Sequence, residues 1–171
     1  MVITGSEILA RNIFSPAATR THHPETGMTF GAGPAGYDVR IKQALDLYPG
    51  QFALASSLEH FTVPRDLVGF VHDKSSLARL GLFLGMGVVE SGWRGHLTIE
   101  IKNQGYRPIH LLAGQPIAQI VFHLVVNPTQ GYDGRYQDQA DEPTPAKLAE
   151  AYEKVNHDAE YPSEPSRRWL D

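Results

Sequence analysis

One acidic residue in a β-prone run is the first candidate for chemistry in this sequence. Alternation over residues 96–103 puts Glu100 on the strand face opposite to its apolar side chains, which are Leu97, Ile99 and Ile101. Most charged strand residues are simply solvated, whereas a carboxyl held against a ligand can move protons as a general acid/base. The alternation therefore places Glu100 on a strand without deciding its role.

A second candidate is a short cationic segment, Asp73-Lys74-Ser75-Ser76-Leu77-Ala78-Arg79. It combines two cations and two hydroxyls with small side chains, and these are groups that bind phosphate oxygens. A polar turn that begins a helix has a similar composition. Both interpretations stay open on the residues alone.

The third candidate is Gly85-Met86-Gly87-Val88-Val89-Glu90-Ser91-Gly92-Trp93-Arg94-Gly95. Its glycines permit close backbone approach, Trp93 offers a flat surface, and Glu90 offers an acceptor for a hydroxyl. A nucleoside needs both a flat contact and an acceptor. Trp93 is equally well explained as an anchor of the core or of an interface.

Metal and nucleophile signatures are missing from the sequence. There is no cysteine, which excludes disulfides, a thiolate nucleophile and the H-x-E and P-C-x-x-C zinc signature of base deaminases. The eight histidines are scattered and form no H-E-x-x-H helix. A Ser/His/Asp triad likewise lacks its nucleophile elbow. We expect no protein-ligated metal.

Composition favours one ordinary globular domain. The 171 residues are 42% hydrophobic, and 15 Lys and Arg against 19 Asp and Glu give a formal net charge of −4. A chain without a basic field is not expected to hold a nucleic-acid polymer. No signal peptide or 18-residue apolar run is visible, so we expect a cytoplasmic protein that does not contact a membrane.

The elements that must position these candidates are mainly β. Thr4-x-x-Glu7 predicts a helix that ends near Asn12, and residues 15–36 read as a long surface loop. From Gly36 to about Val126, short β-prone runs separated by turns predict an antiparallel barrel or sandwich. Thr144-Pro145 predicts a C-terminal helix with a common face of Leu148, Tyr152 and Val155.

Several segments, in this order, resemble the dCTP deaminase branch of the trimeric dUTPase superfamily. The likeness runs through most of the chain, and its stretches are Thr4-Gly5-Ser6-Glu7-Ile8, Gly36-Tyr37-Asp38-Val39-Arg40, Pro49-Gly50-Gln51-Phe52-Ala53-Leu54-Ala55, Lys74-Ser75-Ser76-Leu77-Ala78-Arg79-Leu80-Gly81, Glu90-Ser91-Gly92-Trp93-Arg94-Gly95, Thr98-Ile99-Glu100, Gly114-Gln115-Pro116-Ile117-Ala118-Gln119 and Tyr136-Gln137-Asp138-Gln139. Together they are specific, although singly most are weak.

The resemblance implies a fold, an assembly and an activity. The fold would be a distorted antiparallel β-barrel with short N-terminal and C-terminal helices, in one domain over residues 1–171 whose residues 128–171 form a lid and tail. The assembly would be a homotrimer with sites between subunits. The activity would be deamination of dCTP to dUTP and ammonia without a metal at the base. Mg²⁺ would arrive bound to the triphosphate.

The resemblance also implies roles for individual residues. The catalytic centre would be Glu100, Arg79 and Ser75, and Glu90 would accept the 3′-hydroxyl of the deoxyribose. A proton-shuttling carboxyl works best when it is shielded from water. The phosphates would be held by Lys74, Ser76, Gln119, Tyr132, Arg135, Tyr136 and Gln139, and further substrate contacts would come from Trp93, Thr98 and Ile99.

Departures from the family pattern keep alternatives open. The loop from Leu82 to Val89 is short and lacks a His-x-Thr-Ala-His pattern, Glu90 stands where dUTPases have aspartate, and Lys74 stands where arginine is usual. A dUTP diphosphatase, or a bifunctional enzyme that carries dCTP through to dUMP, is therefore the second hypothesis. A regulatory nucleotide-binding module is the third. dUTP and dCMP remain alternative substrates.

Overall fold

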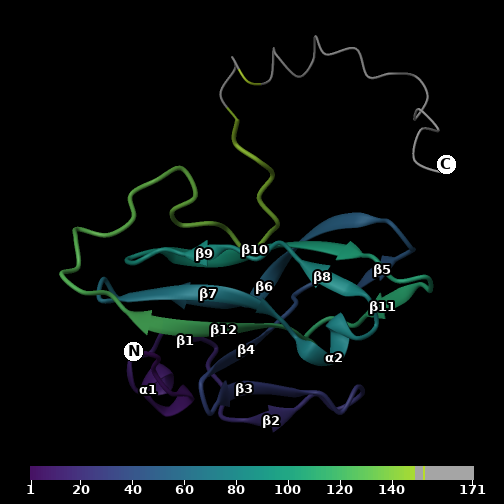
Figure 1. The fold of residues 1–171 in the computed structure, drawn as a ribbon, viewed down its shortest axis with the longest axis horizontal. Helices are drawn as coiled ribbons and strands as arrows, with labels where there is room; N and C mark the ends of the chain where they lie inside the picture. Colours follow the sequence, from purple (N-terminus) through teal and green to yellow (C-terminus); the bar gives the residue numbers. More distant parts are fainter. Residues whose placement is uncertain (149–151, 153–171) are drawn as a thin grey trace, which may run out of the picture.

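The computed structural model describes residues 1–148 and 152, and this part of the chain is mainly β (Figure 1). Among the described residues no helix has the length and apolar character needed to cross a membrane. In chain order the elements are α1 (Gly5–Ala10), β1 (Phe14–Ser15), β2 (Thr21–His22), β3 (Thr29–Gly33), β4 (Gly36–Arg40), β5 (Leu45–Leu47), β6 (Phe52–Thr62), β7 (Leu67–Asp73), α2 (Ser75–Ala78), β8 (Leu82–Leu84), β9 (Val88–Val89), β10 (Arg94–Asn103), β11 (Ile109–Leu111) and β12 (Pro116–Leu124).

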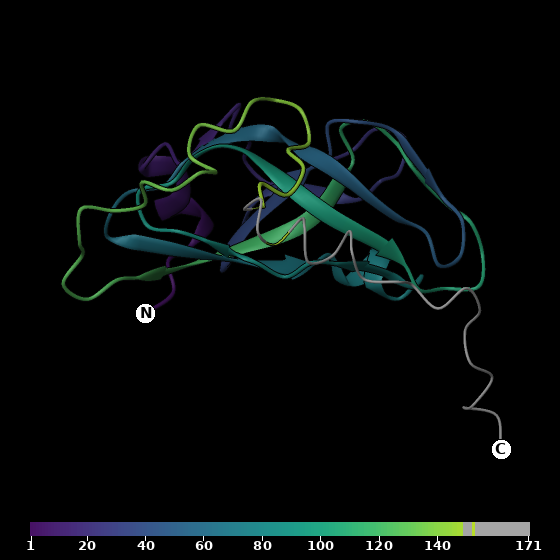
Figure 2. The same ribbon diagram turned by 90° about the horizontal axis from the view of Figure 1, so that it is seen from above.

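The strands form two curled sheets and a small ribbon (Figures 1 and 2). One sheet has the order β1-β6-β10-β8, the other β2-β3-β4-β12-β7-β9, and β11 pairs with β5. Every strand pairing is antiparallel, and a bridge between Ile41 and Ser57 links the end of β4 to β6. The mainly β, distorted-barrel architecture predicted from the sequence is confirmed.

Aromatic side chains fill the space between the two sheets. Phe14 stacks on Tyr37 with ring centroids 4.2 Å apart and meets Phe61 edge-on at 4.7 Å. Tyr37, Phe61 and Phe122 have no exposed surface. Burying rings of this size supplies much of the apolar free energy that holds two sheets together. The core thus ties β1, β4, β6 and β12 into one scaffold.

The N-terminal helix forms where its cap signal predicts it. The Thr4 hydroxyl accepts a hydrogen bond from the Glu7 amide at 3.4 Å, and α1 ends at Ala10 with Asn12 in the left-handed region at φ 52°. The Glu7 carboxylate accepts from Arg11 Nε at 2.7 Å instead of returning to the cap. Half of the expected capping box is therefore present.

Two sequence predictions about secondary structure are wrong. Residues 15–36 are not one loop, because β2 and β3 lie within them and continue the larger sheet. These short strands are joined through backbone hydrogen bonds and show no apolar alternation that would reveal them. Residues 144–148 are not helical: the Thr144 amide donates to Thr98 Oγ1 at 2.9 Å. Tyr152 is helical, and Val155 lies outside the described residues.

A buried ion pair lies at the end of β4. Glu59 has no exposed surface; its carboxylate accepts from Arg40 Nε at 2.7 Å and from the Arg40 amide at 2.9 Å. Burial raises the pKa of Glu59, and the hydrogen bonds from Arg40 oppose that rise. Burial of the Tyr37 hydroxyl, together with the charge of Glu59, raises the pKa of Tyr37 to about 12. Both carboxylate oxygens are therefore matched to donors.

We expect Glu59→Gln to lower the free energy of unfolding by about 2–3 kcal/mol, because an amide N–H would then face a donor of Arg40 in a buried place. Urea unfolding followed by circular dichroism measures this. The control is Asp46→Asn, which breaks an exposed pair with His110 whose side chains are 69% and 68% exposed, and it should leave stability unchanged. Equal stability of both variants would contradict the prediction.

Candidate active site

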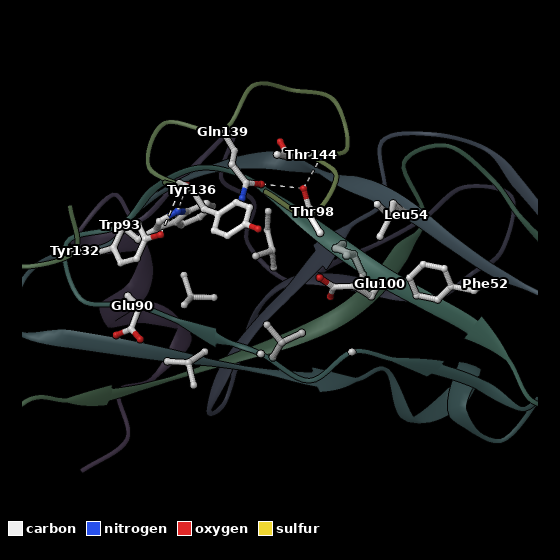
Figure 3. Close-up of a pocket in the computed structure, with 18 residues that line it drawn as sticks. Phe52, Leu54, Glu90, Trp93, Thr98, Glu100, Tyr132, Tyr136, Gln139 and Thr144 are labelled. Atoms are coloured by element: carbon white, nitrogen blue, oxygen red, sulfur yellow. Dashed lines mark hydrogen bonds between the residues drawn. The ribbon is translucent and has the colours of Figure 1, made fainter. Parts of the chain in front are cut away.

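A cavity of about 540 Å³ opens beside β10 (Figure 3). Its walls come from β6, β7, β9, β10, the loop after β8 and the tail after residue 130. The lining residues are Phe52, Leu54, Val71, Gly85, Gly87, Val88, Val89, Glu90, Trp93, Leu97, Thr98, Ile99, Glu100, Tyr132, Tyr136, Gln139, Thr144 and Ala146. The cavity is thus mainly apolar, with two carboxylates in it, as small-molecule sites often are.

The cavity exists because one edge of β10 is only partly covered. β6 pairs along the other edge. On the open edge, β8 pairs with residues 101–103, and the His96 amide donates to the Gln139 carbonyl at 3.0 Å. Within the described residues, no strand pairs with residues 97–99 on that edge. The space between β8 and the tail is therefore where side chains of β10 line the cavity.

Glu100 lies at this opening. Ile99 and Ile101 are buried, whereas Glu100 is exposed and its carboxylate points into the cavity (Figure 3). Among the described residues, no side chain forms a hydrogen bond or ion pair with that carboxylate. The predicted strand face is correct, and the shielding expected of a proton shuttle is absent from the single chain.

Glu90 is the second carboxylate of the cavity and follows β9 directly. It is exposed and lies on a different wall from Glu100 (Figure 3). Trp93 stands between Glu90 and the tail, so a flat surface and an acceptor lie near each other. This is the juxtaposition predicted for a nucleoside site.

Trp93 belongs to the core and to the cavity wall together. It is 5% exposed, and its ring meets Phe61 edge-on with centroids 5.7 Å apart. Its Nε1 donates to the Tyr136 carbonyl at 2.7 Å, and the Tyr136 amide donates to the Tyr132 hydroxyl at 3.1 Å. One buried ring therefore both anchors the core and holds the tail.

The tail is fastened along β10 and closes the top of the cavity. The Asp138 amide donates to the Arg94 carbonyl at 3.0 Å, and the Thr98 hydroxyl donates to Gln139 Oε1 at 2.8 Å and accepts from the Thr144 amide at 2.9 Å. Gly95 permits this approach, because its φ is 137° and a Cβ there would lie 2.6 Å from the Gln139 nitrogen. Five residues of this tail therefore line the cavity, and they are Tyr132, Tyr136, Gln139, Thr144 and Ala146.

The cationic segment lies elsewhere. Ser75 and Arg79 are exposed at α2, outside the cavity, and Arg79 lines a different cavity of about 460 Å³. Lys74 Nζ donates to Asp38 Oδ2 at 2.7 Å, with both side chains 12% exposed. One chain therefore does not bring the predicted catalytic trio together, and Lys74 already has an anionic partner.

The other residues predicted to bind the substrate also lie partly inside and partly outside the cavity. Inside the cavity are Glu90, Trp93, Thr98, Ile99, Tyr132, Tyr136 and Gln139. Outside it are Ser76, on the exposed side of α2, Gln119, half-buried on β12, and Arg135, whose guanidinium donates to the Lys147 carbonyl.

Some lining residues were not singled out from the sequence. Leu54 lies directly opposite Glu100, and Phe52 opposite Lys102, in the β6–β10 register. That register depends on a bulge between His96 and Thr98, which no local pattern indicates. Gly85 and Gly87 did carry a signal, since closely spaced glycines often mark a close backbone approach.

Comparison with known proteins places this geometry in a family. The profile of the dCTP deaminase-like family matches residues 35–125. The "dCTP deaminase, dUMP-forming" of Methanoregula boonei is 38% identical over 111 residues, which are 61% of each protein. The "dCTP deaminase" of Idiomarina loihiensis is 38% identical over 104 residues, 57% of this chain and 53% of that protein. The matches thus span only about three fifths of these relatives' length.

Solved structures agree on the fold. The dUTPase of Staphylococcus phage 80alpha, crystallised with dUpNHpp, has a TM-score of 0.52 and 20% identity over 66% of this chain and 86% of that one. The equine virus protein described as EIAV dUTPase has a TM-score of 0.53 and 22% identity over 72% of this chain and 97% of that one. Because the family profile matches more than half of the sequence, the chain belongs to the dCTP deaminase-like family.

Proposed function

We propose that this protein deaminates dCTP, with Glu100 as the general acid/base. The observation that carries the proposal is a carboxylate that projects into a mainly apolar cavity from the strand that the family profile covers. The names of the relatives from Methanoregula boonei and Idiomarina loihiensis both include dCTP deaminase.

The proposed reaction replaces the cytosine amino group by oxygen. Glu100 takes a proton from water as the water oxygen bonds to C4, and passes a proton to N3. The hydroxyl now on C4 gives its proton through Glu100 to the amino group, which leaves as ammonia as the C4–N bond breaks and the C4 carbonyl forms. One carboxyl can serve each transfer in turn, so no metal is needed at the base.

The cavity accounts for nucleoside binding but supplies no cation. Trp93 and Tyr136 offer aromatic surface, Glu90 would accept the 3′-hydroxyl, and none of the described lining residues is Lys or Arg. A triphosphate carries several negative charges, so cations must reach it from outside the cavity. We propose that they come partly from Mg²⁺ bound to the substrate phosphates.

We propose that the remaining groups come from a neighbouring subunit in a homotrimer. Ser75 and Arg79 are exposed on α2, whereas no Lys or Arg is found among the described residues that line the cavity beside Glu100. Placing α2 of one subunit over the cavity of the next would complete the centre and shield Glu100 from water. The cytoplasmic location remains a prediction.

A second candidate activity is hydrolysis of the resulting dUTP to dUMP. Glu90 and Glu100 line the same cavity on different walls, so one could serve the base while the other oriented water toward phosphorus. The relatives from Methanoregula boonei and Aquifex aeolicus carry the name "dCTP deaminase, dUMP-forming", the latter with 39% identity over 103 residues. We include dUMP formation in the proposal on these grounds.

We expect Glu100→Gln to reduce ammonia release from dCTP by about 10²–10⁴-fold, because the amide cannot exchange protons. Binding of the nucleotide, measured by calorimetry, should persist. The control is Lys102→Gln, on the same strand but outside the cavity. Undiminished deamination in Glu100→Gln would refute the assignment, and binding without turnover by the unaltered protein would favour a regulatory module.

We expect Glu90→Gln to separate the two activities. The unaltered protein incubated with dCTP should release ammonia and pyrophosphate, whereas the variant should release ammonia and accumulate dUTP. Parallel incubations with dUTP and dCMP test the other substrates. Ammonia without pyrophosphate from the unaltered protein would exclude the dUMP-forming activity and leave the deaminase intact.

We expect two inactive variants, Arg79→Ala and Glu100→Gln, to restore activity when they are co-expressed. If each site takes these residues from two subunits, random mixing leaves about a quarter of the sites with both residues intact. Each variant expressed alone is the control. Failure of the mixed protein to recover activity would place both residues in one subunit's site.

A further inference from the structure

Gly85 lies against Glu100 and cannot move away from it. It follows β8, whose Leu84 pairs with Ile101 of β10. The Gly85 amide then donates to the Glu100 carbonyl at 2.8 Å, which continues the same ladder by one residue. The backbones of Gly85 and Glu100 are thus fixed to each other.

There is no room for a side chain at Gly85. A Cβ there would lie 2.9 Å from Glu100 Oε2 and 3.0 Å from Glu100 Cβ. The backbone conformation does not require glycine at this position, because the φ angle of Gly85 is not positive. A methyl group added at Gly85 would therefore compete with the Glu100 side chain for the same space.

Gly87 provides the contrast two residues away. It also lines the cavity and also lacks a positive φ, but a Cβ built there meets nothing within 4 Å. The two glycines share a loop and a cavity wall. They differ in that an added side chain would meet Glu100 at Gly85 but not at Gly87.

The open space beside Gly85 is where the Glu100 carboxylate lies. No hydrogen bond or ion pair from the described residues holds it, so its orientation depends on which rotamers the surrounding atoms allow. A methyl group at position 85 would remove the present orientation. The end of a flexible side chain can swing aside at little cost to folding, so the consequence would be a displaced carboxylate rather than an unfolded protein.

We propose that Gly85 is a positioning residue for Glu100, since its lack of a side chain keeps the carboxylate at the place where it serves the base. This inference rests on the proposed function of Glu100 in dCTP deamination. A displacement of about 1 Å in a reacting group can cost 10²-fold in rate. The effect should appear in kcat, because Trp93 and Glu90 bind the rest of the nucleotide from other parts of the wall.

The test compares Gly85→Ala with Gly87→Ala in the full-length protein. We expect Gly85→Ala to lower kcat for ammonia release roughly 10- to 100-fold, while KM for dCTP and the melting temperature stay close to those of the unaltered protein. Gly87→Ala, whose added methyl group would meet no atom within 4 Å, should lose far less of its kcat than Gly85→Ala. A kcat for Gly85→Ala within about twofold of the control would overturn the proposal.

A double-mutant cycle separates positioning from a general structural effect. Glu100→Asp retracts the carboxylate from position 85, so Gly85→Ala should cost little further activity in that background. Equal losses in both backgrounds, or a fall in melting temperature and binding together, would overturn positioning. If the unaltered protein does not deaminate dCTP, the proposed function fails instead, and that result is distinguishable from an active protein indifferent to Gly85→Ala.

Discussion

The backbone pairing of β10 is the constraint on which the site depends. One edge of this strand is occupied by β6 over its whole length, and the other is divided between β8 and the tail. Strand edges carry unpaired polar groups that must be covered or used. Here the uncovered interval around residues 97–99 becomes the cavity, and Glu100 lies at its border with β8. The pairing of β10 with β6 and β8 therefore both builds the sheet and leaves the interval where the cavity lies.

Charge distribution sets the second constraint. The cavity contains two carboxylates and, among its described lining residues, no cation. The cationic residues of the α2 segment are partly committed, since Lys74 is paired with Asp38, which leaves Arg79 as its exposed positive group. A polyanionic ligand would be repelled by Glu90 and Glu100 alone. The described part of one chain therefore leaves the charge of such a ligand without a cation in the cavity.

Much of the fold could be predicted from the sequence, and the reasons are local. Alternation placed the faces of β10 correctly, and Thr4 fixed the start of α1 through one hydrogen bond. The strands β2 and β3 were missed because they are held by backbone pairing, β2 with β3 and β3 with the adjacent β4, and not by a pattern of their own. The predicted start of the C-terminal helix at Thr144 was wrong, and the amide of that residue is bonded to Thr98, 46 residues away. In this second case a tertiary contact overrode the local signal.

The sequence indicated several residues of the cavity but not how the strands bring them together. Glu90, Trp93 and Glu100 share a cavity, as expected for residues from neighbouring segments of the chain, although β9 and β10 belong to different sheets. Leu54 enters it only through the β6–β10 register, and that register shifts at a bulge. The role of Gly85 could not be read from composition, since Gly87 looks identical in sequence and differs only in what its missing side chain would meet.

Trp93 couples closure of the cavity to the core. Its ring is buried against Phe61, and its Nε1 donates to the Tyr136 carbonyl, so the first part of the tail is fastened to the core. The second fastening, at Thr98, is made by two hydrogen bonds to half-buried groups. Net contributions of such bonds are about 1 kcal/mol each, far below the stability of a whole domain. The fastening at Thr98 is therefore weaker than the anchoring of Trp93 in the core and the pairing of β10.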